Sequence, residues 1–306
     1  MNSPPAAGAT PSISVIIPSV NGVPMITDTL AALEAQSARP NAEVLVLDCS
    51  TEETRRVIRD RFPSVELIAF EKRLSIPELR AEGLRRARGN IVVFLEDHCL
   101  AAPGWLERIA ASHAAHPHTV ISGGVTNGAT ERARDWAHYF CEYAPHQPPL
   151  REGETNQVAG NSASYKRAAL EALGSEAFRP RWEYFLRRRL LERGYRFYCD
   201  PRLEVCHRIS FSLAELLRQR FHYSRSFAAM RSEDATRWRR IVLAAGSLLV
   251  PPLMLGRVTA TVRSHRTHLR EFCAAWPLLV LLALAAGLGE LIGAVAGPGT
   301  SLEKVR

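Results

Sequence analysis

The sequence predicts an α/β fold, in which a doubly wound and mostly parallel sheet is followed by a C-terminal helical membrane segment. Strand-like and helix-like segments alternate through the first half of the chain. The strand-like segments are short apolar runs, which are typical of strands buried on both faces of a sheet. Two long apolar segments follow residue 240. At 306 residues, the chain can form one large or two modest domains with a hydrophobic core.

The expected elements follow one another in order. We expect strands at residues 13–18, 43–48, 65–70 and 91–95, and helices at residues 26–36, 51–61 and 76–87. Thr27 or Asp28 is available to cap the first helix. Apolar strands that alternate with helices pair in parallel and carry helices on both faces of the sheet. The first strand is not followed by G-x-G-x-x-G and the chain has no G-x-x-x-x-G-K-S/T, so neither dinucleotide nor P-loop binding is indicated.

Charge and cysteine content narrow the classes of protein. The formal net charge is +8, which suits nucleic acid, an anionic membrane surface or a phosphorylated substrate. The chain has no aromatic RNA-binding pattern, zinc-finger spacing or tandem basic helices, so nucleic acid is not an expected partner. The six cysteines form no C-x-x-C pair and are expected to be reduced thiols of a cytosolic domain. Residues 1–11 lack the regions of a signal peptide and predict a disordered tail.

Chemistry-bearing side chains come directly after the expected strand at residues 91–95. Glu96, Asp97 and His98 stand at its carboxyl end, which is where open α/β sheets bind ligands. Two carboxylates and an imidazole in a packed core would each need a partner. Oxygen ligands with one imidazole suit manganese or a similar divalent cation. The sequence therefore predicts a metal site here, with a solvent-exposed loop as the alternative.

Two further residues stand where such a sheet would bind a ligand. Asp48 ends the second strand, where a carboxylate can accept hydrogen bonds from a base or a ribose. Its alternative is a helix cap or an Asx turn before Thr51. Arg80 lies on the helix that precedes the metal strand, and its alternative is a solvated helix face.

Four motifs in this order resemble family 2 glycosyltransferases of the GT-A fold. They are SVIIP at 14–18, VLD at 46–48, RAEGL at 80–84 and FLEDH at 94–98. The family has a strand ending in proline, a V-V-D-D strand end, an A-R-N-x-G helix and an F-L-D-x-D metal motif. The FLEDHC segment is also similar to the D-x-H motif of polypeptide N-acetylgalactosaminyltransferases. The resemblance covers roughly residues 12–208.

The resemblance implies a site for a nucleotide sugar. The residues that it implies at the nucleotide-sugar site are Pro18, Ser19, Asp48, Arg80, Glu96, Asp97 and Asn161. Asp48 should contact the base, and Arg80 the nucleotide or the acidic residues around it. Glu96 and His98 would hold Mn²⁺ or Mg²⁺ on the diphosphate, while a ligand role for Asp97 stays open. Glu96 replaces the family's first Asp, and Cys49 stands where a second Asp is common, so base recognition can differ.

Three later residues extend the resemblance. Asn161, in VAGNSASYKR at 158–167, matches a segment that lines the donor-sugar pocket, with a plain turn as the alternative. Glu183 matches the acidic pair that supplies the general base, although Tyr184 replaces the second acid; the alternative is an ion pair with Arg187. His207 matches the V-x-H close of the fold as a third metal ligand, with a structural histidine as the alternative.

The implied reaction moves a sugar from a nucleotide-sugar donor to a hydroxyl or phosphate acceptor. A cation neutralises the leaving diphosphate, and a base takes the acceptor proton. The positioning of donor and acceptor supplies much of the remaining rate enhancement. A single displacement inverts the anomeric carbon, as family 2 implies, whereas the D-x-H relatives retain its configuration, so the stereochemistry stays open. The departures at Cys49, Glu96 and Tyr184 leave a second class, a non-catalytic nucleotide-sugar-binding membrane scaffold.

The last third of the chain predicts membrane attachment. Residues 211–240 predict an amphipathic basic helix at the interface. The apolar run at 241–256 contains Pro251-Pro252 and is short for a span, whereas residues 276–296 predict a transmembrane helix. Arginines between the two runs should stay cytoplasmic, which makes the first a re-entrant or interfacial hairpin. Two full spans are the alternative.

These expectations divide the chain into four parts. They are a tail at 1–11, a GT-A domain at 12–210, an interfacial helix at 211–240 and membrane-associated helices at 241–306. We expect the catalytic domain on the cytoplasmic side of a bacterial-type inner membrane, acting on a membrane lipid or lipid-linked acceptor in the synthesis of a cell-envelope polysaccharide. The oligomeric state stays open.

Overall fold

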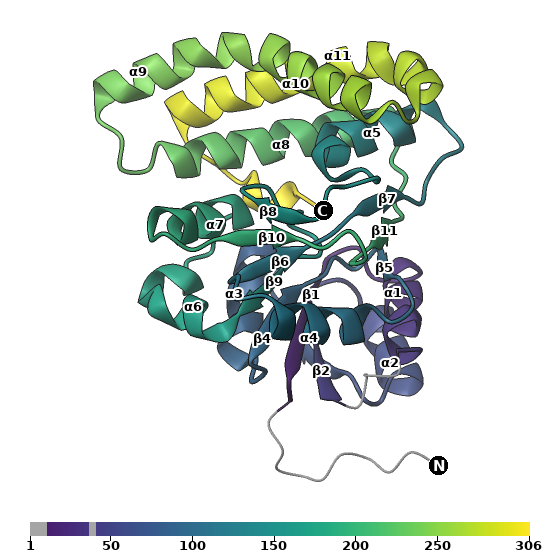
Figure 1. Ribbon diagram of the computed structural model, residues 1–306. Helices are drawn as coiled ribbons and strands as arrows, with labels where there is room; N and C mark the ends of the chain where they lie inside the picture. The colour runs from purple at the N-terminus through teal and green to yellow at the C-terminus, as the bar shows by residue number, and fades with distance from the viewer. Residues whose placement is uncertain (1–10, 37–40) are drawn as a thin grey trace. The chain divides into compact units, whose positions relative to one another are not determined.

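The computed structural model describes residues 11–36 and 41–306, which form two compact units (Figure 1). The first unit is Met1–Thr126 with Pro148–Arg208, and the second is Asn127–Gln147 with Ile209–Arg306. Nearly all of the tail predicted at 1–11 lies outside the described residues. Residues 127–147 belong to the C-terminal unit, although the predicted domain limits included them in the first domain.

The first unit is built on an eight-stranded sheet in the order β3-β2-β1-β4-β9-β6-β10-β8. The strands β1 (Ile13–Ser19) and β2 (Ala42–Asp48) are buried along their whole length, as their apolar sequences predict. The strands β2 and β4 (Ile91–Phe94) lie on the two sides of β1 and are parallel to it. The strand β3 (Glu66–Ala69) pairs in parallel with β2. This order confirms the predicted α/β fold and its parallel half.

The other half of the sheet contains antiparallel strands. The strand β9 (Ser164–Lys166) runs antiparallel between β4 and β6 (Val120–Ser122). The strand β10 (Phe197–Cys199) is parallel to β6, and β8 (Gly153–Thr155) is antiparallel to β10. Because β9 runs opposite to β4, the residues just before β9 lie at the carboxyl end of β4, where the candidate metal motif begins.

A second, three-stranded sheet has the order β5-β11-β7. It consists of β5 (Cys99–Ala101), β11 (Val205–His207) and β7 (Val125–Asn127). The antiparallel register of β5 and β11 sets His207 opposite Cys99. Two distant parts of the sequence therefore meet directly after β4.

Of the three helices predicted in the first unit, those at 51–61 and 76–87 begin within one residue of the predicted position, and the first has a different cap. The helices of this unit are α1 (Met25–Glu34), α2 (Glu52–Arg61), α3 (Ile76–Arg86), α4 (Trp105–Ala115), α6 (Arg167–Ala172) and α7 (Glu183–Glu192), with the 3₁₀ helix η3 (Gly174–Phe178). Thr51 caps α2, and Ser75 forms a capping box with Glu78 on α3. The predicted cap of α1 by Thr27 or Asp28 is wrong, because Pro24 holds the N-cap position and the Thr27 hydroxyl donates to the Pro24 carbonyl.

The second unit is helical. Its elements are α5 (Ala133–Tyr143), η2 (Ala144–His146), α8 (Leu213–Arg231), α9 (Arg237–Gly246), η4 (Ser247–Leu249), α10 (Val250–His265), α11 (Leu269–Ala296) and η5 (Leu302–Lys304). The segment from α9 to α10 spans 29 residues and α11 spans 28, so both are long and apolar enough to cross a membrane. The first apolar segment is thus longer than its sequence suggested. Pro251 and Pro252 lie in the first turn of α10, where proline leaves no hydrogen bond unmade.

The helices α8 and α11 pack side by side through small residues. A Cβ atom on Gly289 would collide with the Phe221 carbonyl, and one on Gly293 would collide with the Arg225 carbonyl. From Gly289 to Gly293 on α11 the contact moves from Phe221 to Arg225 on α8, which is four residues forward on both helices, so the two helices run parallel. On α8, Ser224 faces Gly289 and Ala228 faces Gly293. Small residues that let two backbones approach closely are typical of helix pairs in membranes.

Candidate active site

Two histidines and one glutamate meet at the carboxyl end of β4. His98 Nε2 lies 3.0 Å from His207 Nε2 and 3.4 Å from a carboxylate oxygen of Glu96. The same oxygen lies 4.0 Å from His207 Nε2. Both histidines are buried. The structure thus brings together the three residues predicted to hold a metal, although 109 positions separate the two histidines in the sequence.

The spacing of these atoms fits a divalent cation. A cation that holds six ligands at about 2.1 Å places neighbouring ligand atoms about 3 Å apart. The ligand atoms of Glu96, His98 and Cys99 also lie within 4.8 Å of one another. Burial raises the pKa of the Cys99 thiol well above its usual value. Glu96, His98 and His207 offer one carboxylate and two imidazoles, a donor set that suits manganese or a similar cation.

The charges of the cluster are strongly coupled. Burial disfavours an ionised Glu96, but hydrogen bonding and charge from His98, with charge from Arg80 and His207, hold its pKa well below the usual range. Burial likewise disfavours a charged His98, but its hydrogen bonds to Asp97 and Glu96 raise its pKa to about 9. The carboxylates therefore favour a positive charge at this point, and a metal ion would replace the imidazole proton.

Asp97 supports His98 and does not face the other ligand atoms. One of its oxygens accepts from the backbone N–H groups of Val20 and Asn21, both at 3.1 Å. The other accepts from the Asn21 side chain at 3.1 Å and lies 2.9 Å from His98 Nδ1. A carboxylate on Nδ1 fixes the imidazole with Nε2 available as a ligand. The contacts of Asp97 in this structure are therefore with His98 Nδ1 and with the chain after β1.

Arg80 joins the candidate base to the candidate metal ligand. One guanidinium nitrogen contacts the Glu183 carboxylate, and another lies 3.5 Å from the Glu96 carboxylate. Arg80 is buried, so the alternative of a solvated helix face is wrong. Gly83 allows this placement, because it lets α3 pack directly on β1 and β2. Arg187 does not pair with Glu183 but donates to the Val158 carbonyl.

Asp48 is fully buried at the end of β2 and is hydrogen-bonded to the protein. One oxygen accepts from Ser19 at 2.8 Å and from Ser50 at 2.6 Å. The other accepts from Arg55 Nε at 3.0 Å, a partner that the sequence motif did not indicate. The Ser50 contact is made by the hydroxyl and not by the backbone N–H of an Asx turn, and Thr51 holds the N-cap of α2, so neither form of the alternative describes Asp48. Contact with a base would compete with these partners. Pro18 and Ser19 lie beside it, in register with Leu47 and Asp48.

Asn161 lies against the cluster because β9 is antiparallel to β4. Its amide nitrogen donates to the Cys99 sulfur at 3.5 Å. Its buried side-chain oxygen has no hydrogen-bond partner within residues 11–36 and 41–306. A Cβ atom on the neighbouring Gly160 would lie 3.4 Å from a Glu183 oxygen. The segment is therefore more than an exposed turn, and the Asn161 oxygen could accept from a bound molecule.

The comparisons with known proteins agree on the family and the fold. A family model described as glycosyl transferase family 2 matches residues 14–174. Validoxylamine A glucosyltransferase of Streptomyces hygroscopicus subsp. limoneus is 32% identical over 156 residues, which are 48% of this chain and 34% of that protein. Glucosyl-dolichyl phosphate glucuronosyltransferase of Haloferax volcanii is 24% identical over 139 residues, covering 44% of this chain and 42% of that protein. The chain thus spans well under half the length of these relatives.

Solved structures share the GT-A fold. The mannosyltransferase PcManGT from Pyrobaculum calidifontis, in complex with GDP-Man and Mn²⁺, has a TM-score of 0.59 at 21% identity over 93% of this chain and 88% of that one. GalNAc-T7 with UDP, GalNAc and Mn²⁺ has a TM-score of 0.52 at 18% identity, over 66% of this chain and 44% of that one. At these identities the likeness concerns the fold alone.

Proposed function

Because the chain belongs to glycosyl transferase family 2, we propose that it moves a sugar from a nucleotide-sugar donor to a hydroxyl or phosphate acceptor with the help of a divalent metal. The observation that carries the proposal is the meeting of Glu96, His98 and His207 within 4.0 Å, beside the Arg80–Glu183 pair. A scaffold that only supports other proteins has no need of this arrangement.

Each residue of the cluster has a proposed task. Glu96, His98 and His207 would hold Mn²⁺ or Mg²⁺, and two solved structures of the same fold contain Mn²⁺. The cation would neutralise the charge that develops on the leaving diphosphate. Asp97 orients His98, while Asn161 and Asp48 would contact the sugar and the base. Family membership favours inversion at the anomeric carbon.

Glu183 is the proposed general base, and its need depends on the acceptor. A hydroxyl acceptor must lose its proton as it attacks, and Glu183 would take that proton once the acceptor shares or displaces its Arg80 partner. A phosphate acceptor is already ionised at neutral pH and needs no such base. The effect of removing the Glu183 carboxylate therefore separates the two classes of acceptor.

The proposed acceptor is a membrane lipid or a lipid-linked sugar. Two long apolar helical segments support membrane attachment. One relative is named as a transferase to glucosyl-dolichyl phosphate, a lipid-linked acceptor. The arginines between the two segments favour a cytoplasmic catalytic domain at a bacterial-type inner membrane. The synthesis of a cell-envelope polysaccharide would fit this location. The proposed glycosyltransferase domain then covers residues 12–210 except for 127–147, and is followed by the segments 211–240 and 241–306.

Hydrolysis of the donor sugar by the purified full-length chain tests the proposal. We expect release of nucleoside diphosphate from at least one donor of a sugar-nucleotide screen with Mn²⁺, its loss with chelator and its return when Mn²⁺ is restored. His98→Ala should fold but lose metal-dependent nucleotide binding, whereas His118→Ala, outside the cluster, should keep it. Full activity in excess EDTA would refute the metal proposal. Binding of donors without any turnover would favour the non-catalytic scaffold.

A further inference from the structure

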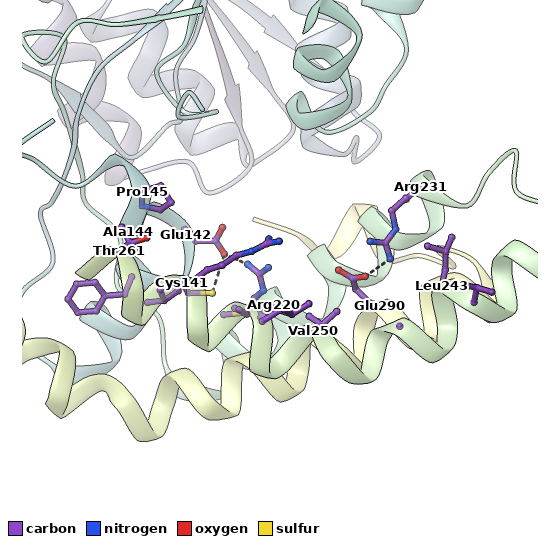
Figure 2. A pocket seen from close by; sticks show the side chains of 17 residues that line it. Cys141, Glu142, Ala144, Pro145, Arg220, Arg231, Leu243, Val250, Thr261 and Glu290 are labelled. Atoms are coloured by element: carbon purple, nitrogen blue, oxygen red, sulfur yellow. Dashed lines mark hydrogen bonds and ion pairs between the residues drawn. The ribbon is translucent and has the colours of Figure 1, made fainter. Parts of the chain in front are cut away.

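The helical unit contains a cavity of about 610 Å³ that no step of the proposed reaction uses (Figure 2). Helices α5, α8, α9, α10 and α11 and the 3₁₀ helix η2 contribute to its wall. Most of the wall is apolar, formed by Phe140, Ala144, Pro145, Val242, Leu243, Val250, Leu253, Met254 and Val258. A volume of this size is typical of pockets that bind small molecules, which measure roughly 300–1,000 Å³.

Two ion pairs stand in this apolar wall. Arg220 on α8 contacts Glu142 on α5 at 2.6 Å, and Arg231 on α8 contacts Glu290 on α11 at 2.5 Å (Figure 2). The second pair gives Glu290, the acid within the apolar run at 276–296, a partner of opposite charge. Arg257 on α10 also lines the cavity, so three arginines face two glutamates. The polar side of the cavity therefore has an excess of positive charge.

Arg220 and Arg231 have N–H groups that their glutamate partners do not use. Each guanidinium carries five N–H groups, and one nitrogen of each is used on a glutamate. The buried Nε groups of Arg220 and Arg231 have no hydrogen-bond partner in the part of the chain that the structure describes. A buried donor without a partner is costly, so a ligand that accepts from it would be stabilised. Arginine is well suited to phosphate oxygens, which it can bind through two parallel hydrogen bonds.

The wall and the arginines together define the class of ligand. Inorganic phosphate would leave the apolar wall unfilled, and a neutral lipid would leave the arginine donors unpaired. We propose that the cavity binds a lipid phosphate, with its apolar chain along α9 and α10 and its phosphate at Arg220 and Arg231. The identification of this lipid as the sugar acceptor rests on the proposed function, whereas the binding itself does not.

Two glycines offer a matched test of the cavity. Gly246 lines it and Gly256 does not, and a Cβ atom on either would meet no heavy atom within 4 Å. Both are helical, so Gly246→Phe should fill the cavity and Gly256→Phe should serve as the control. Binding of farnesyl phosphate to the full-length chain in neutral detergent is measured by calorimetry. We expect binding by the wild type and Gly256→Phe, and a loss of about tenfold or more in Gly246→Phe.

The phosphate contact needs its own variant. Arg220→Gln combined with Glu142→Gln removes both charges and leaves no unpaired carboxylate. Charged hydrogen bonds account for about a tenfold preference or more, so the wild type should prefer farnesyl phosphate over farnesol by that factor and the double variant should lose the preference. Equal binding of farnesol by the wild type would overturn the phosphate assignment. Competition by inorganic phosphate at equal concentration would show a free-anion site instead.

The outcomes separate the inference from the proposed function. Unchanged binding in Gly246→Phe, or no binding by the wild type, overturns the lipid site even when the chain hydrolyses a sugar nucleotide. Farnesyl phosphate bound at this cavity by a chain that neither binds nor hydrolyses any donor leaves the inference standing and refutes the transferase. Donor hydrolysis should be equal in the wild type, Gly246→Phe and Gly256→Phe, because none of these substitutions lies in the candidate active site.

Discussion

The side chain of Asp97 shows how one residue can join a metal cluster to the sheet that supports it. Its carboxylate accepts from the backbone after β1 and lies 2.9 Å from His98 Nδ1. A carboxylate that contacts the second nitrogen of a metal-binding histidine fixes the tautomer and the orientation of its ring. Asp97→Asn should therefore weaken Mn²⁺ binding by about 10–100-fold, because an amide cannot replace all the accepting contacts. Titration with Mn²⁺ followed by electron paramagnetic resonance checks this without any assay of turnover.

The control for Asp97→Asn is a buried aspartate elsewhere in the same unit. Asp200 is buried and pairs with Arg202 at 2.8 Å, away from the cluster. Asp200→Asn should leave Mn²⁺ affinity unchanged. Equal affinities in all three proteins would show that His98 needs no orienting carboxylate.

Glu183→Gln should keep donor affinity and lower kcat by about 100-fold or more with a hydroxyl acceptor, the range that general-base catalysis contributes. The glutamine keeps the size of the side chain and a hydrogen bond to Arg80 but cannot accept the proton. The measurement compares kcat with donor affinity in the same preparation. A near-normal kcat would assign Glu183 to the positioning of Arg80 or indicate a phosphate acceptor.

Motif order predicted which residues meet, but not how they are partnered. Glu96, His98 and His207 were predicted because residue type and order alone identify them. Arg80 was expected to contact the nucleotide or nearby acids, but which acid it contacts, and the contact of Asp97 with His98, depend on side-chain direction, which no spacing in the sequence specifies. Arg55 on Asp48 was missed for the same reason, since seven positions separate them along the chain.

At the scale of elements, a buried histidine connects α4 to β9. His113 Nε2 lies 2.9 Å from the Ser164 hydroxyl, which itself donates to the Ile121 carbonyl. His113 Nε2 therefore donates, and its buried Nδ1 has no hydrogen-bond partner within the described residues. Burial, with charge from Lys166, lowers the pKa of His113 to about 3. A proton added at Nδ1 would therefore have no hydrogen-bond acceptor among the described residues.

The sign of the resulting pH dependence follows from the two states. The unfolded His113 binds a proton below about pH 6.5, while the folded one does not until about pH 3. Between these values the unfolded state holds more protons, so the free energy of unfolding falls as the pH falls, by about 1.4 kcal/mol per pH unit. His113→Gln should flatten this slope between pH 6.5 and pH 5, as measured by urea unfolding in detergent. His116→Gln is the control, and equal slopes in both variants would contradict the assignment.

Element prediction succeeded where segments are long and failed where they are short. The strands β1 and β2 are seven residues each and wholly apolar or buried, so their pattern was visible. The strand β9 has three residues, too few to show any period, yet its antiparallel direction brings Asn161 to the cluster. The cap of α1 was misplaced because Thr27 and Asp28 are good capping residues, whereas the backbone turns at Pro24.

At the scale of the whole molecule, residues 127–147 belong to the second unit although they lie between two parts of the first unit in the sequence. The helix α5 lies in the second unit, where Phe140 contacts Phe272 of α11 with ring centres 5.5 Å apart. A chain that ends at Arg208 would keep α5 and lose α11. We expect such a chain to aggregate, because the buried Trp136 and Phe140 would be exposed to water.

A second truncated chain completes this prediction. It also ends at Arg208, but a short glycine–serine linker replaces residues 127–147. It should elute as a soluble species in size-exclusion chromatography and still bind nucleotide. Equal solubility of both chains would show that α5 is held by the first unit. The sequence could not predict this division, because nothing in residues 127–147 reveals which distant helix packs on them.

The glycine contact between α8 and α11 has a consequence for the membrane itself. Helices in contact over this length share one depth, so the arginines of α8 and the apolar surface of α11 enter a bilayer together or stay at its surface together. Arg218 is exposed on α8 and would be costly to carry into the bilayer interior, so we expect the bundle to lie within a single leaflet with its arginines among the headgroups. A bundle that fills one leaflet adds area to that leaflet alone. The protein should therefore collect on strongly curved vesicles, whose outer leaflet is stretched, in preference to flat bilayers of the same lipids.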